Sequence, residues 1–220
     1  NITHELKTPI AVANAANDAL LDFGAADDAV RREKYLTVIR EQLAALGSMV
    51  ERILTMSVEE RGEITLCREA LEIRPLLEEV AGRFRMKGRG RATISVEVED
   101  PDLKISADRF HLTHALDNLV DNALKYSGDE VRIRLSARRT AKGAELRVAD
   151  NGIGIDRTAQ AHIFEKFYRV PTGDRHDVKG FGLGLYYVRL IARKHGGEIT
   201  VESAPGRGSA FNLTLSDDER

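Results

Sequence analysis

The 220-residue sequence contains no tryptophan and a single cysteine, Cys67. One cysteine excludes an internal disulfide and fits a reducing compartment. No apolar run approaches the roughly 18 residues of a membrane-spanning helix, and no signal peptide is recognisable. The net charge of −2 provides no overall attraction to nucleic acid, whereas a hydrophobic fraction of 42% is enough for a core. We therefore expect one or two domains without disulfides and without a nucleic acid partner.

The first 57 or so residues predict two helices. Apolar residues recur at spacings of three and four from Ile2 to Phe23 and again from Leu36 to Ile53, as in amphipathic helices. Residues 24–28 interrupt the pattern, and Asp27 or Asp28 can cap the second helix. A single antiparallel hairpin cannot cover both apolar stripes. We therefore expect a homodimer in which two hairpins form a four-helix bundle.

The pattern changes near residues 59–62, where charged residues and a glycine interrupt the apolar spacing. Beyond this point, alternating patterns predict strands and longer periods predict about three helices, which indicates an α/β sandwich with one continuous set of strands and helices on one face. The fold class is therefore α+β, with a hairpin domain at 1–58 and a second domain at 59–220. The expected strands are 63–69, 93–99, 131–137, 144–149, 198–202 and 209–215, and the expected helices are 73–84, 112–123 and a last one ending near His195.

Asn118, Asn122 and Lys125 are spaced by four and three residues and therefore share one helix face, beside the apolar stripe. Amide oxygens are hard ligands suited to Mg²⁺, and a lysine supplies a point charge for phosphate oxygens. The alternative is an ordinary polar face in contact with solvent, and this helix taken alone favours that alternative.

Asp150, Gly152 and Gly154 come directly after a strand pattern. The glycines allow a tight turn and a close backbone approach, and the carboxylate can accept a hydrogen bond from an exocyclic amino group. A dinucleotide fingerprint would need a third glycine where Arg157 stands. A plain turn is an equal alternative for this segment by itself.

Gly180, Gly182 and Gly184 precede a predicted helix, whose N-terminal N–H groups can hold a phosphate. The loop is not a Walker A motif, because no Gly-Lys-Ser/Thr follows. It is not a protein-kinase glycine loop either, because the His-Arg-Asp and Asp-Phe-Gly motifs are missing. Taken together and in this order, the three segments indicate a nucleotide site.

With these segments, the chain closely resembles the catalytic core of bacterial sensor histidine kinases over nearly its whole length. The residues from His4 to Pro9 are similar to the phosphoacceptor box, and Gly206-Arg207-Gly208-Ser209 fills the place of the last glycine-containing box. The other similar segments are 118–126 for the N box, 150–154 for the first glycine box, 164–169 for the F box and 180–184 for the second glycine box. The resemblance implies a dimerisation and phosphoacceptor hairpin followed by an ATP-binding domain of the Bergerat type.

The resemblance also implies roles for single residues. Asp150 would select adenine, while Asn122, assisted by Asn118, would hold Mg²⁺ against the triphosphate of ATP. It further assigns to the nucleotide Lys125, Tyr126, Gly152, Gly154, Phe167, Arg169, Gly180, Gly182, Leu183 and Gly184. One departure is His114, where many relatives have Gln. His111 and His114 lie three apart and would suit zinc, but no cysteine or further ligand cluster accompanies them.

The helical wheel places His4 away from the apolar stripe. With Ile2 at zero, the stripe covers about −60° to +80°, and His4 falls near 200°. An exposed imidazole can act as a nucleophile near pH 7, and the resemblance assigns to Glu5 the acceptance of its proton. Pro9 leaves the carbonyl of Glu5 without its helical hydrogen bond, which allows a local bend.

Asn118 also bears on the type of reaction. Related ATPases of the gyrase, chaperone and mismatch-repair type carry a Glu at the matching position as a base for water, and an amide cannot take that proton. We therefore expect transfer to a side chain rather than to water, and the resemblance implies His4 as that side chain and an Asp of a response regulator receiver domain as the next acceptor. Thr8 lies one turn after His4, and the resemblance implies a phosphatase activity toward that regulator as a further hypothesis. An inactive dimeric ATP-binding scaffold is the alternative.

Residues 156–179 contain basic side chains and Pro171-Thr172-Gly173, and we expect them to form a mobile lid anchored by Phe164 and Phe167. The chain begins without a methionine, inside the phosphoacceptor motif. We therefore expect the cytoplasmic portion of a longer protein that is anchored in the membrane through an N-terminal part absent from this sequence.

Overall fold

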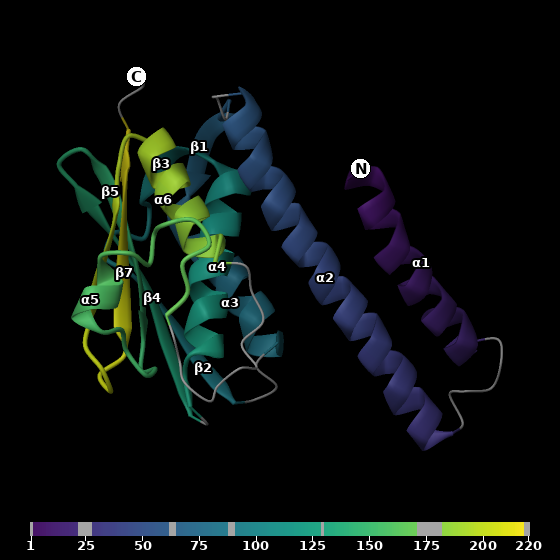
Figure 1. Cartoon of the computed structure of the whole chain (residues 1–220). Helices are drawn as coiled ribbons and strands as arrows, with labels where there is room; N and C mark the ends of the chain where they lie inside the picture. The colour runs from purple at the N-terminus through teal and green to yellow at the C-terminus, as the bar shows by residue number, and fades with distance from the viewer. Residues whose placement is uncertain are drawn as a thin grey trace. The chain divides into compact units, whose positions relative to one another are not determined.

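A computed structural model describes residues 2–21, 28–61, 65–87, 91–128, 130–170 and 182–217 (Figure 1). The chain divides into two compact units, Asn1–Gly62 and Glu63–Arg220. Helix α2 ends at Arg61, so the expected boundary between residues 58 and 59 lies in its last turn and stays a prediction. None of the described helices is long and apolar enough to cross a membrane.

The first unit is a hairpin of two helices, α1 (Ile2–Leu21) and α2 (Ala29–Arg61), which contact each other. Asp28 caps α2, as expected, because its carboxylate accepts hydrogen bonds from the N–H groups of Val30 (3.0 Å) and Arg31 (3.2 Å). Leu36 and Leu43 belong to the predicted apolar seam of α2 and are 53% and 58% exposed. One hairpin by itself therefore leaves apolar side chains in contact with water.

The second unit contains seven strands and four helices within its described residues. They are β1 (Arg68–Glu72), α3 (Ile73–Lys87), β2 (Ala92–Val98), β3 (Lys104–Asp108), α4 (Arg109–Lys125), β4 (Val131–Thr140), β5 (Gly143–Asp150), α5 (Arg157–Gln160), α6 (Gly184–Lys194), β6 (Ile199–Ser203) and β7 (Ser209–Ser216).

Five strands form the main sheet in the order β2-β4-β5-β7-β6, in which β2 and β4 are parallel and the other pairs are antiparallel. The expectation of one continuous set of strands was wrong, because β1 and β3 pair separately as a small antiparallel sheet. The strand expected at 63–69 begins only at Arg68, and β3 and α5 were not expected. The α/β sandwich itself is confirmed.

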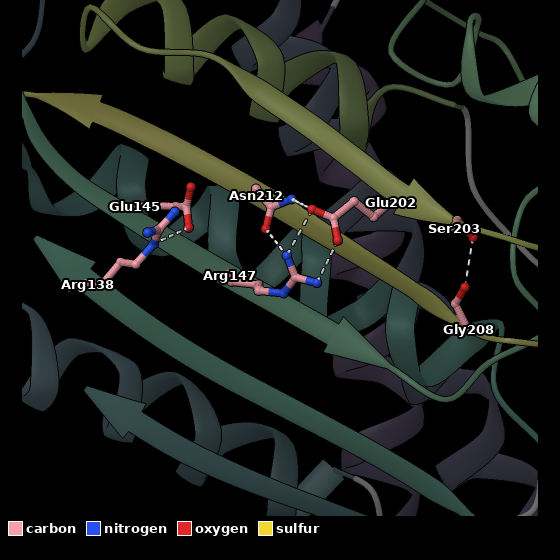
Figure 2. Close-up of polar contacts among 7 residues, drawn as sticks. All are labelled: Arg138, Glu145, Arg147, Glu202, Ser203, Gly208 and Asn212. Carbon is pink, nitrogen blue, oxygen red and sulfur yellow. Dashed lines mark hydrogen bonds and ion pairs between the residues drawn. The ribbon is translucent and has the colours of Figure 1, made fainter. Parts of the chain in front are cut away.

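Helices α3, α4 and α6 cover one face of the main sheet (Figure 1). Successive side chains along each strand point alternately to this face and to the opposite face. Inward-facing Leu135, Leu146 and Leu213 are almost completely buried. The opposite face is polar: Arg138 lies 2.7 Å from Glu145, and Arg147 bonds both Glu202 and Asn212 (Figure 2). The sheet therefore has one core face and one solvated face.

A buried histidine joins the end of α6 to the start of α4. The ring of His195 is completely buried, and its Nε2 accepts a hydrogen bond from the backbone N–H of Asp108 at 3.0 Å. Nδ1 must then carry the proton, which it donates to the carbonyl of Ile191 at 2.8 Å. Burial lowers the pKa of His195. A neutral imidazole thus links the two helices whose other ends form the candidate site.

Candidate functional site

Asp150 ends β5 and is the half-buried carboxylate of the site. Its Oδ1 accepts hydrogen bonds from the backbone N–H groups of Gly152 at 2.7 Å and Ser209 at 3.3 Å. Burial raises the pKa of the Asp150 carboxyl, and the two N–H donors act in the opposite direction. These bonds hold an acceptor in one orientation, as recognition of an amino group requires.

The loop after β5 needs its glycines for contact with other segments. A Cβ atom at Gly152 would lie 2.7 Å from both Asp150 Oδ1 and the carbonyl oxygen of Tyr126. Gly154 has φ +72°, and a Cβ atom there would lie 1.9 Å from the carbonyl oxygen of Ala204. The N–H of Ile153 also donates to Tyr126 O at 3.0 Å. The structure thus brings the end of α4 and the first glycine box together.

Asn118 faces the start of α6. Its Nδ2 donates to the carbonyl of His114 at 2.9 Å, which turns Oδ1 toward Gly184. A Cβ atom at Gly184 would lie 2.5 Å from that Oδ1, so glycine permits the close approach of the two helices. Asn122 lies one turn further along α4 and is half-buried, and its amide makes no hydrogen bond within the described part of the chain. The N box and the second glycine box therefore adjoin.

The first turn of α6 has no side-chain cap. Leu183 occupies the N-cap position without a side-chain hydrogen bond, and the first turn carries no acidic residue. The N–H groups of this turn and the positive end of the helix dipole therefore suit an anion. Gly182, at φ +72°, accepts a hydrogen bond from the N–H of Phe167 at 3.0 Å, which joins the F box to the second glycine box.

The two phenylalanines of the F box behave differently. Phe164 is buried and contacts Phe211 edge-on, with ring centroids 6.4 Å apart, as expected of an anchor. Phe167 is 68% exposed and has φ +62°, so the expectation that it also anchors the segment by burial was wrong. Within the expected lid, residues 157–160 form α5. Gly180 and residues 171–179 lie outside the described residues.

The predicted cations belong to the same unit as the site, whereas the predicted phosphoacceptor belongs to the other unit. Lys125 Nζ forms an ion pair with Asp121 Oδ2 at 2.6 Å, and Arg169 is exposed. His4, Glu5 and Thr8 belong to α1 in the other unit. Thr8 is exposed, and the side chains of His4 and Glu5 lie outside the described residues.

Several polar contacts near the site were not predicted from the sequence, although His114 itself was noted. Ser209 donates its N–H to Asp150, although only its place in the last glycine-containing box was noted. The structure also buries Ser127 Oγ and His114 Nε2 without a hydrogen-bond partner among the described residues. Spacing alone does not reveal these atoms, because their burial depends on segments distant in sequence. The position of Ser127 directly after Tyr126 was the one available signal.

Comparison with known families covers both units. Residues 107–219 match the family of histidine kinase-, DNA gyrase B-, and HSP90-like ATPases, and residues 1–62 match the His Kinase A (phospho-acceptor) domain. The chain belongs to the sensor histidine kinases. Each unit of this histidine kinase core therefore matches one of the two domains that the sequence predicted.

Individual relatives and structures agree with this assignment. The chain is 37% identical to the sensor protein RprX of Bacteroides fragilis, across 98% of this chain and 42% of RprX. It is 33% identical to the sensor-like histidine kinase SenX3 of Mycobacterium tuberculosis, across 100% of this chain and 55% of SenX3. The chain thus spans about half the length of these relatives.

Two solved structures extend the likeness to the fold. The catalytic domain of histidine kinase ThkA is 27% identical, with a TM-score of 0.60 over 68% of this chain and 97% of that domain. ThkA in complex with the response regulator protein TrrA is 25% identical, with a TM-score of 0.66 over 99% of this chain and 60% of the ThkA chain. These similarities confirm the predicted fold class.

Proposed function

We propose that this histidine kinase core uses ATP to phosphorylate its own His4 and then passes the phosphate to an aspartate of a response regulator. The observation that carries the proposal is the pairing of Asn118 with the uncapped start of α6. A neutral amide, and not a carboxylate base, stands at position 118 beside a helix end that suits an anion. Asp150, held by two backbone N–H groups, supplies the acceptor for adenine.

The residues of α4 fit a magnesium ion bound together with ATP. Asn118 directs an oxygen toward α6, and the amide of Asn122 has no hydrogen bond within the described part of the chain. Two amide oxygens leave most coordination positions to waters and phosphates, which Mg²⁺ prefers. Mg²⁺, when bound, would neutralise charge on the triphosphate. Lys125 forms an ion pair with Asp121, and its ammonium has further donors for a phosphate oxygen.

The transfer itself would proceed at His4. A ring nitrogen of His4 attacks the γ-phosphorus of ATP, an N–P bond forms, and the bond from that phosphorus to the bridging oxygen breaks to release ADP. The ring proton passes to Glu5, which acts as the general base. Asn118 disfavours the competing attack by water, because its amide cannot accept a proton from the nucleophile.

The molecule that receives the phosphate next is inferred from the chemistry of phosphohistidine. A phosphohistidine is a donor for an aspartate carboxylate, and the similar kinase ThkA is solved in complex with the response regulator protein TrrA. We therefore propose a receiver domain as the partner of the hairpin. Removal of phosphate from that regulator, assisted by Thr8, remains a separate hypothesis, as does membrane anchoring of the full-length protein. The domain limits 1–58 and 59–220 stay part of this proposal.

A homodimer is proposed from the hairpin. The exposed Leu36 and Leu43 belong to one heptad pattern, and a second hairpin of the same kind would cover them. Each protomer would then contribute one His4 to the bundle.

The proposal is tested by labelling with ATP carrying ³²P in the γ position. Label should appear on the protein in an acid-labile, alkali-stable form, and His4→Gln should abolish it. Thr8→Ala is the matched control in the same helix and should retain the label. Labelling that persists in His4→Gln would rule out His4 as the acceptor, and ATP binding without any label would favour the inactive scaffold.

A further inference from the structure

Helices α4 and α6 meet along a seam formed by His111, His114, Asn118, Gly184 and Tyr187. Tyr187 of α6 is almost completely buried, and its hydroxyl lies 2.6 Å from Nδ1 of His111. The same ring packs against that of His114, with centroids 4.9 Å apart and planes at 77°. One tyrosine therefore contacts two histidines that are separated by one turn of α4.

The seam leads from these rings directly to the nucleotide site. The carbonyl of His114 holds the amide of Asn118, and Asn118 Oδ1 faces Gly184. Gly184 and Tyr187 are three residues apart on α6 and therefore lie on the same side of that helix. The antiparallel helices thus meet at two successive levels, Tyr187 with the histidines and Gly184 with Asn118.

The contact at Tyr187 is directional and shielded from water, because Tyr187 is almost completely buried. Burial raises the pKa of the Tyr187 hydroxyl above its ordinary value, so the hydroxyl keeps its proton at neutral pH and can donate it to Nδ1 of His111. Burial also lowers the pKa of His114, whose Nε2 has no hydrogen-bond partner among the described residues. His114 therefore meets Tyr187 through ring packing, while His111 supplies the directional bond.

We propose that Tyr187 is a positioning residue for ATP: its bond to His111 and its packing on His114 keep the first turn of α6 against Asn118. This inference rests on the proposed function, because it assigns the start of α6 to the phosphates and Asn118 to magnesium. Loss of the hydroxyl would let α6 shift relative to α4 and loosen the anion site. Tyr187 touches neither substrate nor metal in this role.

Tyr187→Phe tests the inference, because it removes the hydroxyl and keeps the ring. Dissociation of the analogue AMPPNP in the presence of Mg²⁺, and the KM and kcat of His4 labelling, would be measured on the whole chain. We expect the Kd and KM to rise about three- to tenfold, as for a lost hydrogen bond of about 1 kcal/mol, with kcat unchanged at saturating ATP.

Tyr186→Phe is the matched control. Tyr186 is the neighbouring tyrosine on α6, and its ring carries Lys166 at 5.0 Å and Arg189 at 5.8 Å rather than a histidine. Removing this hydroxyl keeps the ring, so the Kd for AMPPNP should stay at the wild-type value. His111→Leu removes the acceptor from the other side and should raise the Kd as Tyr187→Phe does. The double variant should be no worse than either single one.

The outcomes separate the inference from the function on which it rests. Wild-type Kd in Tyr187→Phe, with or without a lower unfolding temperature, would mean that Tyr187 only packs the core and would overturn the inference alone. Failure of the wild-type chain to bind AMPPNP would overturn the proposed function and the inference with it. Should Tyr187→Phe not fold, His111→Leu provides the same measurement with the same two decisive results.

Discussion

The hairpin and the ATP-binding unit differ in how completely they bury their apolar residues. In the ATP-binding unit, Leu76, Leu116 and Leu213 are inaccessible to water, because three helices cover the sheet. In the hairpin, Ala16 is buried between the helices, whereas Leu36 and Leu43 are more than half exposed. The first unit therefore needs a partner to complete its core, and the second closes its core within one chain.

The largest expected effect tests this difference between the units at the exposed apolar residues of the hairpin. Replacing Leu36 and Leu43 together by Asp would place two charges in the proposed dimer interface, where unpaired buried charges are strongly unfavourable. We expect dimerisation to weaken by roughly a hundredfold or more, measured by sedimentation equilibrium, while the Kd for AMPPNP stays unchanged.

The matched control for this prediction lies on the ATP-binding unit. Phe110 is an exposed apolar residue of α4, and Phe110→Asp should leave dimerisation intact if the hairpin carries the interface. A double hairpin variant that still sediments as a dimer would contradict the division of roles between the two units.

Much of this division could be predicted from the sequence, because apolar residues recur at different spacings in helices and in strands. Apolar residues at spacings of three and four predict both hairpin helices. The alternating patterns in β4, β5 and β7 predict strands of the main sheet. Strand β3 escaped prediction because its five residues, Lys104–Asp108, pair with β1 far earlier in the chain rather than with a neighbour. Non-local pairing leaves no signal in a short window.

The candidate site likewise contains contacts between distant residues that the sequence could not predict. Asp150, Asn118 and Gly184 could be predicted because each belongs to a segment with its own spacing. The bond from Ser209 to Asp150 and the contact of Tyr187 with His111 could not, because each joins residues more than 50 positions apart. Phe167 is 68% exposed and has a backbone φ of +62°, and its apolar side chain predicts neither feature.

A second prediction uses pH to change the stability of the ATP-binding unit, which contains the buried His195. The pKa of His195 is lowered by burial from its ordinary value of 6.5, so the unfolded chain binds the proton more tightly than the folded one. The stability that neutral His195 gives is complete above pH 6.5 and is lost as the pH falls toward the lower, folded-state pKa. His111 and Arg68 disfavour the added proton, and Asp108 favours it.

Thermal unfolding between pH 7.5 and 5 measures this effect. The transition of the ATP-binding unit should move to lower temperature on acidification, and His195→Gln should make that dependence shallower. His162→Gln is the control, because His162 is an exposed residue in an ion pair with Glu165. An unchanged pH dependence in His195→Gln would show that another buried histidine, such as His114, carries the linkage.

The smallest expected effects lie on the solvated face of the sheet (Figure 2). Arg147 links Glu202 on β6 with Asn212 on β7, whereas Arg138 pairs only with Glu145 in the contacts of that face. Asn212 is buried, so Arg147→Ala removes the partner of a polar group that water reaches poorly.

We expect the free energy of unfolding to fall by roughly 0.5–1 kcal/mol for Arg147→Ala, after discounting for solvent screening. Arg138→Ala, its matched control, should leave the urea midpoint nearly unchanged, because the Arg138 side chain is 54% exposed and an ion pair at the surface adds little. Equal losses in the two variants would mean that the number of partners and the burial of Asn212 do not matter, and that this face contributes to stability in a way that its exposure does not indicate.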